Sequence, residues 1–124
     1  MPRRTDPPDR AEVDDYFKVL KQITCAELAE KLASGTPGTI LDVRTEGEWI
    51  GRRIPGAVLV PLQQLDDRLE EVMDLPGPLY VHCEHGVRSM DASLYLIWQG
   101  RRDVHNVREG LCAWRGPTES GPRR

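Results

Sequence analysis

Short strand-like segments that alternate with helix-like segments are the feature that most limits the fold of this sequence. Four segments of four or five residues have the apolar or β-branched character of strands: residues 39–43, 57–60, 78–82 and 103–107. Several of the segments around them carry apolar side chains at the spacing of one helix face. This alternation predicts an α/β fold with a central, mostly parallel sheet and helices on both faces.

Two helix starts are marked by a capping pattern. Thr24 and Thr45 each stand three residues before a Glu, so that each pair can satisfy two backbone N–H groups reciprocally. The predicted helices are a segment that follows Thr24 and stops at Gly35, a brief helix that carries Trp49, and two more over residues 62–73 and 89–99.

The length of 124 residues fits a single domain. Residues 1–16 are rich in Pro, Asp and Arg and lack periodicity, which predicts a flexible lead-in. Residues 117–124, with the sequence PTESGPRR, lack periodicity as well and are predicted to form a flexible tail. The domain is therefore expected over residues 17–116.

Composition excludes several function classes. The formal net charge is −3, whereas a nucleic-acid-binding domain would need a basic face. No apolar run approaches the roughly 18 residues of a membrane span, and no apolar stretch follows the N-terminal charges as in a secretory signal. Three cysteines without a CxxC pair argue for a reducing compartment. These observations predict a cytoplasmic protein that binds neither nucleic acid nor membrane.

The loop after the third predicted strand is the candidate site. Cys83 follows strand 78–82 at once, at the strand end where open α/β sheets bind ligands. The helix predicted from Ser89 supplies free N–H groups, Gly86 lets several of them point inward, and Arg88 adds positive charge. Such surroundings stabilise a thiolate and bind anions such as the sulfonate end of thiosulfate. The alternative is a buried structural cysteine.

Four motifs resemble those of the rhodanese homology domain and occur in the order of that family. They extend over nearly the whole predicted domain, and their combination is more specific than any one of them. The motifs are LDVRTEGEW (41–49), RIPGAVLVPLQQL (53–65), YVHCEHGVRS (80–89) and NVREGLCAW (106–114).

The resemblance implies a sulfurtransferase that works in two half-reactions. Cys83 would attack the outer sulfur of a small-molecule donor such as thiosulfate, hold it as a persulfide, and pass it to cyanide, a thiol or a thiol protein. No metal and no organic cofactor are implied. The loop backbone would cradle the persulfide and the donor's anion through Glu84, His85, Gly86, Val87 and Arg88.

Two charged residues at the end of the first predicted strand, Asp42 and Arg44, match the family's Asp-x-Arg. In one interpretation they support the site by shaping the catalytic pocket. In the other they form a structural ion pair or cap network that holds loops together. Arg53 departs from the family because it stands where a His is usual, which puts in doubt a contact near the active-site side of the fold.

The remaining cysteines and the histidines allow fewer roles. Cys112 either resolves the persulfide as a disulfide with Cys83 or serves as a small apolar residue beside a Trp. Cys25 lies in the first turn of a predicted helix and is expected to be structural. His82 and His85 flank the cysteine without a standard zinc spacing, so no metal site is predicted.

Two other functions compete with sulfur transfer. The generic cysteine-phosphatase signature is His-Cys, five residues and Arg, whereas four residues separate Cys83 from Arg88 here. The shorter loop suits one sulfur atom better than a phosphoryl group. A non-catalytic rhodanese-like module is the second alternative, and such modules often lack the cysteine that this chain retains. The physiological donor, the acceptor and the oligomeric state stay open.

Overall fold

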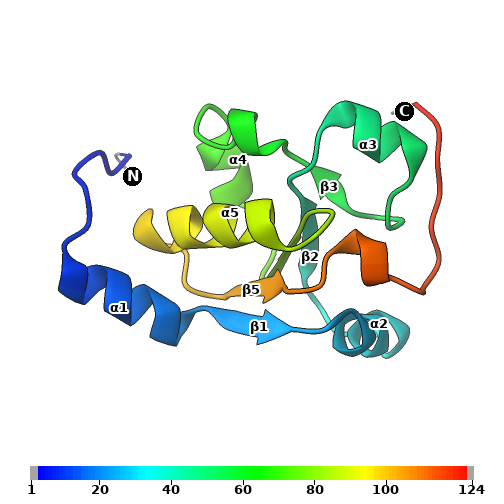
Figure 1. Ribbon diagram of the computed structural model, residues 1–124, viewed down its shortest axis with the longest axis horizontal. Helices are drawn as coiled ribbons and strands as arrows, with labels where there is room; N and C mark the ends of the chain where they lie inside the picture. The colour runs from blue at the N-terminus through cyan, green and yellow to red at the C-terminus, as the bar shows by residue number, and fades with distance from the viewer. Residues whose placement is uncertain (1–2, 123–124) are drawn as a thin grey trace.

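A five-stranded parallel sheet with the strand order β1-β5-β4-β2-β3 forms the centre of the protein (Figure 1). The computed structural model describes residues 3–122. Four of the strands were predicted; β1 was not, because it is three residues long and two of them are exposed. The strands are β1 (Lys21–Ile23), β2 (Thr39–Asp42), β3 (Val58–Leu59), β4 (Leu79–His82) and β5 (Val104–Val107).

Helices cover both faces of the sheet, as predicted. Both predicted capping boxes are present, at the starts of α2 and α3. Within residues 3–122, no helix combines the length and the apolar character needed to cross a bilayer. The helices are α1 (Arg10–Val19), α2 (Cys25–Ala33), α3 (Glu46–Gly51), α4 (Leu69–Met73) and α5 (Val87–Trp98), with 3-10 turns η1 (Leu62–Gln64) and η2 (Leu111–Ala113).

Helix α1 was not predicted. Its N-cap is Asp9, whose side chain accepts a hydrogen bond from the Glu12 N–H at 2.8 Å. Arg4 donates to the Glu12 carboxylate at 2.6 Å and so ties the preceding segment to the helix. Tyr16 is the only residue of α1 that is buried, which explains why no periodic apolar pattern marks this helix. The domain limits of residues 17–116 stay a prediction.

The helix predicted over residues 62–73 is interrupted. It is divided into η1 and α4, with a turn between them. The three side chains that suggested the helix, Leu65, Leu69 and Val72, are nevertheless all buried. The apolar spacing therefore identified the side chains that face the core but did not fix the hydrogen-bonding pattern of the backbone.

Alternate side chains of the central strands enter two hydrophobic clusters. Leu41 and Val81 join the cluster to which α1, α4 and α5 contribute. Ile40 and Tyr80 join the cluster built with α2, α3 and η2. All four side chains are at most 6% exposed. Burial of each aliphatic side chain contributes about 1.5–3 kcal/mol, so both faces of the sheet anchor the strand ends that carry the site.

The pairing of β2 with β4 brings the ends of two loops together. Asp42, the last residue of β2, lies in register with His82, the last residue of β4. The Val43 N–H continues the ladder by donating to the His82 carbonyl at 3.1 Å. The loops that follow the two strands therefore begin side by side at the carboxyl edge of the sheet, the edge at which such folds bind ligands.

Arg101 holds the end of α4 in place. Its Nη1 donates to the carbonyls at positions 72, 73 and 75, at 3.0, 3.2 and 2.8 Å. The residue is 8% exposed, so water offers little replacement for these bonds. Arg101 also forms an ion pair with Asp103 at 2.8 Å. The neighbouring Arg102 forms an ion pair with Asp15 in which both side chains are 55% exposed.

Arg101→Met is expected to lower the free energy of unfolding by about 2–4 kcal/mol, because it removes three hydrogen bonds to carbonyls at the end of α4 and the ion pair of Arg101 with Asp103. Arg102→Met is the matched control and should change it by less than about 0.5 kcal/mol, since exposed ion pairs contribute little. Urea denaturation of both variants measures the difference. Equal losses in the two variants would contradict this role of Arg101.

Candidate active site

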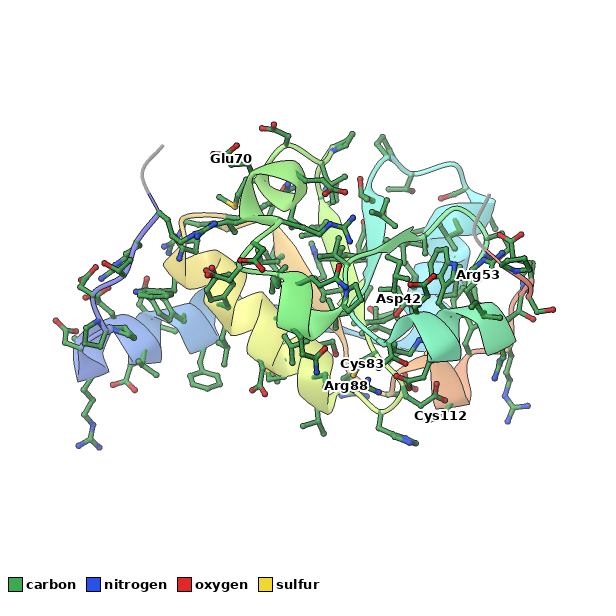
Figure 2. The ribbon with its side chains drawn as sticks, turned by 90° about the horizontal axis from the view of Figure 1, so that it is seen from above. Asp42, Arg53, Glu70, Cys83, Arg88 and Cys112 are labelled. Atoms are coloured by element: carbon green, nitrogen blue, oxygen red, sulfur yellow. The ribbon has the colours of Figure 1, made fainter. Side chains whose placement is uncertain are left out.

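Cys83 lies directly after β4, where the loop turns toward α5 (Figure 2). Its side chain is 1% exposed. The sulfur accepts hydrogen bonds from the Gly86 N–H at 3.1 Å and the Ser89 N–H at 3.3 Å. The Ser89 hydroxyl lies 3.4 Å from the same sulfur. Backbone donors at the start of a helix thus converge on Sγ, an arrangement that favours negative charge on the sulfur.

Two glycines allow the loop to pack against the segment that follows β5. Gly86 has φ +88°, and a Cβ there would overlap the Arg108 carbonyl oxygen. Gly110 approaches the loop from the other side, and a Cβ there would overlap the Glu84 carbonyl. The Leu111 N–H donates to the Cys83 carbonyl at 2.8 Å. Sequence analysis identified Gly86 for its conformational freedom but did not identify Gly110 as part of this contact.

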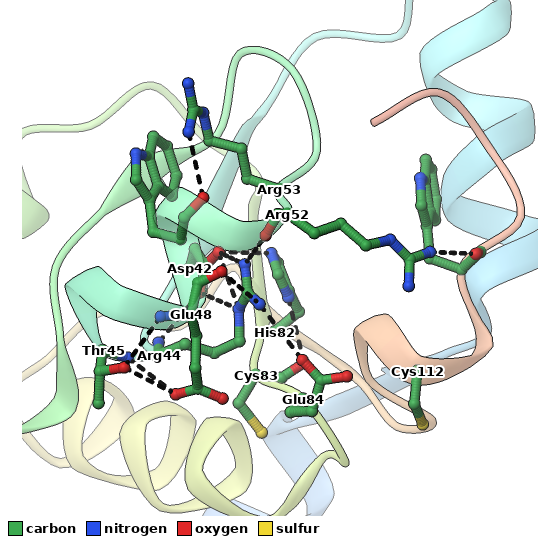
Figure 3. Close-up of polar contacts among 12 residues, drawn as sticks. Asp42, Arg44, Thr45, Glu48, Arg52, Arg53, His82, Cys83, Glu84 and Cys112 are labelled. Atoms are coloured by element: carbon green, nitrogen blue, oxygen red, sulfur yellow. Dashed lines mark hydrogen bonds and ion pairs between the residues drawn. The ribbon is translucent and has the colours of Figure 1, made fainter. Parts of the chain in front are cut away.

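Arg44 links β2 to the Cys83 loop (Figure 3). Its guanidinium is 2% exposed and donates to both carboxylate oxygens of Asp42, with the shortest contact at 2.8 Å. Its Nη1 also donates to the Glu84 carboxylate at 3.2 Å. Its Nη2 donates to the Arg52 carbonyl at 2.6 Å, just after α3. The structure shows the ion pair of the second interpretation, and a role of Asp42 and Arg44 in shaping the catalytic pocket stays a prediction.

His82 is buried behind the loop. Its Nε2 lies 3.6 Å from the Asp42 carboxylate, and its Nδ1 lies 3.2 Å from the Cys83 carbonyl. Burial lowers the pKa of His82, which favours the neutral ring. The structure therefore places His82 in the packing at the strand end.

Arg88 is paired with Glu48, which sequence analysis did not assign to the site. The guanidinium donates to both carboxylate oxygens, at 2.7 and 2.9 Å. Hydrogen bonds from Arg88 lower the pKa of Glu48 to about 2, so the carboxylate is ionised at neutral pH. Arg88 was expected to add positive charge to the site, and Glu48 was predicted only as part of a capping box. No local pattern connects two residues 40 positions apart.

The other predicted site residues of the loop are largely open to solvent. His85 is exposed, and the Val87 side chain is 70% exposed. Glu84 is partly buried through its contact with Arg44. The loop therefore combines a buried sulfur with an accessible outer rim.

Arg53 contacts a different part of the molecule. Its guanidinium stacks 4.8 Å from the Trp49 ring and donates to the Trp49 and Gly121 carbonyls. It points away from Cys83 (Figure 3). The residue that stands in place of the family's usual His therefore links the C-terminal segment to α3, and within residues 3–122 it forms no hydrogen bond or ion pair with the Cys83 loop.

The two remaining cysteines differ in exposure. Cys25 is buried, donates to the Gly110 carbonyl at 3.2 Å, and has its pKa raised to about 12 by burial. This placement agrees with its expected structural role. Cys112 is exposed in η2, and its N–H donates to the Glu84 carbonyl at 3.1 Å. Of the two roles considered for Cys112, that of a small apolar residue beside a Trp does not fit the exposed side chain, and a disulfide with Cys83 stays a prediction.

Comparison with known proteins agrees with this architecture. Residues 24–117 match the family model described as Rhodanese-like domain. The chain belongs to this family. The rhodanese-like domain of this chain thus includes β2, the Cys83 loop, α5 and η2.

Individual relatives extend the comparison. The rhodanese-like domain is 33% identical to the putative sulfurtransferase YtwF of Bacillus subtilis, and the match covers 81% of this chain and 95% of that protein. It is 37% identical to the thiosulfate sulfurtransferase GlpE of Pseudomonas syringae, with 61% and 71% covered. A rhodanese-like crystal structure from Staphylococcus aureus is 35% identical with a TM-score of 0.70, with 81% and 97% covered. These similarities confirm the predicted fold and support a sulfurtransferase-family role.

Gly86→Ala is expected to destabilise the protein by more than the backbone strain of an alanine at positive φ can explain, because the added Cβ would also overlap the Arg108 carbonyl oxygen. Gly56→Ala is the matched control, because Gly56 also has positive φ but has nothing within 4 Å of an added Cβ. We expect the free energy of unfolding to fall by about 1 kcal/mol in Gly56→Ala and by about 2–4 kcal/mol in Gly86→Ala.

Only Gly86→Ala should also slow alkylation of Cys83 by iodoacetamide, because it displaces an N–H that donates to the sulfur. Urea denaturation and peptide mass spectrometry measure the two effects. Normal alkylation in Gly86→Ala would show that this N–H does not activate the thiol.

Proposed function

We propose that this protein is a sulfurtransferase in which Cys83 carries the transferred sulfur as a persulfide. The observation that supports the proposal most strongly is the convergence of the Gly86 and Ser89 N–H groups on the Cys83 sulfur. These donors stabilise the thiolate that attacks and can stabilise the outer sulfur after transfer. The backbone from Glu84 to Arg88 is proposed to form the cradle.

The proposed reaction has two balanced steps. With thiosulfate as donor, the Cys83 thiolate attacks the outer sulfur, an S–S bond forms, and the donor's own S–S bond breaks to release sulfite. With cyanide as acceptor, the carbon attacks the outer sulfur of the persulfide, which releases thiocyanate and restores the thiolate. A thiol, including a protein thiol, can replace cyanide as the acceptor. Neither step requires an oxidant or a metal.

The proposed setting is the cytoplasm, because the mechanism needs a reduced Cys83. The three cysteines at positions 25, 83 and 112 are all free thiols in the structure. A reducing compartment would maintain them in this state and would also supply thiols as sulfur acceptors.

Cys83→Ser should abolish thiosulfate:cyanide sulfur transfer and leave the fold intact, because the hydroxyl can accept the same N–H groups but cannot form a persulfide. Cys112→Ser is the control and should retain more than about half of the activity. The assay measures thiocyanate, and circular dichroism verifies folding. Near-normal turnover in Cys83→Ser with Cys112 also replaced would remove Cys83 from the mechanism.

Hydrolysis of an aryl phosphate by the unaltered protein separates sulfur transfer from the phosphatase alternative. Loop length sets the radius of the ring of N–H donors, and four residues between Cys83 and Arg88 leave little space for a phosphoryl group. We expect negligible hydrolysis. Hydrolysis faster than sulfur transfer from thiosulfate would overturn the assignment.

A further inference from the structure

The charged side chains around the Cys83 loop do not form a positive site. Two arginines and three acids lie there in two groups of ion pairs, Arg44 with Asp42 and Glu84, and Arg88 with Glu48, and their formal charges sum to −1. Each arginine of the cluster donates to at least one carboxylate. The cluster consists of Arg44, Arg88, Asp42, Glu48 and Glu84.

Glu48 is held in front of Arg88 from two sides. Its carboxylate accepts two hydrogen bonds from Arg88, which extends from α5. It also accepts from the Thr45 N–H at 3.0 Å and lies 3.2 Å from the Thr45 hydroxyl, both of α3's N-cap. The position of Glu48 therefore does not depend on Arg88 alone, and its carboxylate is a fixed partner of that guanidinium.

The Arg88–Glu48 pair is partly open to solvent at the end of the Cys83 loop. The side chains of Arg88 and Glu48 are 33% and 30% exposed, so solvent contacts both. The family resemblance implies that the loop from Glu84 to Arg88 binds the donor's anion, and Arg88 is the only cationic side chain in that loop. An anionic donor that binds Arg88 must displace or approach the Glu48 carboxylate, and each further negative charge on the donor increases the repulsion.

We propose that Glu48 is a specificity-determining residue that neutralises Arg88 and makes the site favour a thiol persulfide of low charge over a small dianion. This inference rests on the proposed function and specifies its donor class. With a persulfide R–S–SH, the Cys83 thiolate attacks the outer sulfur and a new S–S bond forms. The donor's S–S bond breaks, its electron pair leaves on R–S⁻, and the proton stays on the transferred sulfur. No oxidant is required.

The first experiment measures charge selection at the thiol without sulfur transfer. Peptide mass spectrometry gives the rates at which Cys83 reacts with anionic iodoacetate and with neutral iodoacetamide. Glu48→Gln preserves the capping box and should raise the ratio of the two rates about fivefold. Glu46→Gln is the matched control, because Glu46 is exposed in the first turn of the same helix. It should change the ratio by less than about 1.5-fold.

Arg88→Gln provides a second, independent variant. It leaves Glu48 ionised and without its guanidinium partner, so the ratio should fall below that of the unaltered protein. An unchanged ratio in Glu48→Gln would overturn the proposal. A decrease would overturn it as well, because it would mean that Glu48 holds Arg88 in a productive position for anions. Equal effects of Glu48→Gln and Glu46→Gln would also overturn it, because they would indicate a general effect of net charge.

The second experiment measures donor preference directly. In Glu48→Gln, the KM for thiosulfate should fall about fivefold. The KM for the persulfide of 2-mercaptoethanol, in which the group that bears the persulfide is uncharged, should change by less than about twofold. An equal change in both KM values would contradict selection by charge. If no donor supports transfer in the unaltered protein while the alkylation ratio still shifts, the proposed function fails and charge selection by Glu48 is supported.

Discussion

The buried guanidinium of Arg44 is the interaction on which the geometry of the site depends. It lies between Asp42 on β2, the Arg52 carbonyl after α3 and Glu84 in the Cys83 loop. An isolated charge at 2% exposure would be strongly unfavourable, so the arginine fixes the positions of the acceptors that surround it. Removal of Arg44 would leave the Asp42 carboxylate, which is 0% exposed, without its guanidinium partner. The ion pair therefore couples the sheet, a helix and the reactive loop.

Backbone contacts complete this support. The parallel register places the end of β2 beside the end of β4, and the segment after β5 donates to the Cys83 carbonyl. Gly86 and Gly110 permit the close approach of the two loops. With its backbone fixed in this way, the loop directs the Gly86 and Ser89 N–H groups at one sulfur atom before any substrate binds. Donors fixed in advance stabilise developing charge without reorganisation, which is the basis of the proposed mechanism.

Local sequence patterns predicted much of this arrangement. Strand β4, the position of Cys83 at its end, the glycine of the loop and both capping boxes follow from residues that are close in sequence. The patterns did not predict β1, which is mostly exposed, or α1, which buries only Tyr16. They also did not predict the Arg88–Glu48 pair, because its members come from different helices and the fold alone brings them together. That pair neutralises the positive charge expected from Arg88, and together with the Arg44 ion pairs it gives the charged groups around the loop a formal sum of −1.

Mass spectrometry of the Cys83 peptide after exposure of the unaltered protein to thiosulfate or a thiol persulfide tests the central claim most directly. We predict a gain of one sulfur atom on Cys83, with Cys25 and Cys112 unmodified, and loss of that sulfur when cyanide is added. A folded protein that takes up no sulfur on Cys83 from either donor, or that takes it up only on Cys112, would contradict the account.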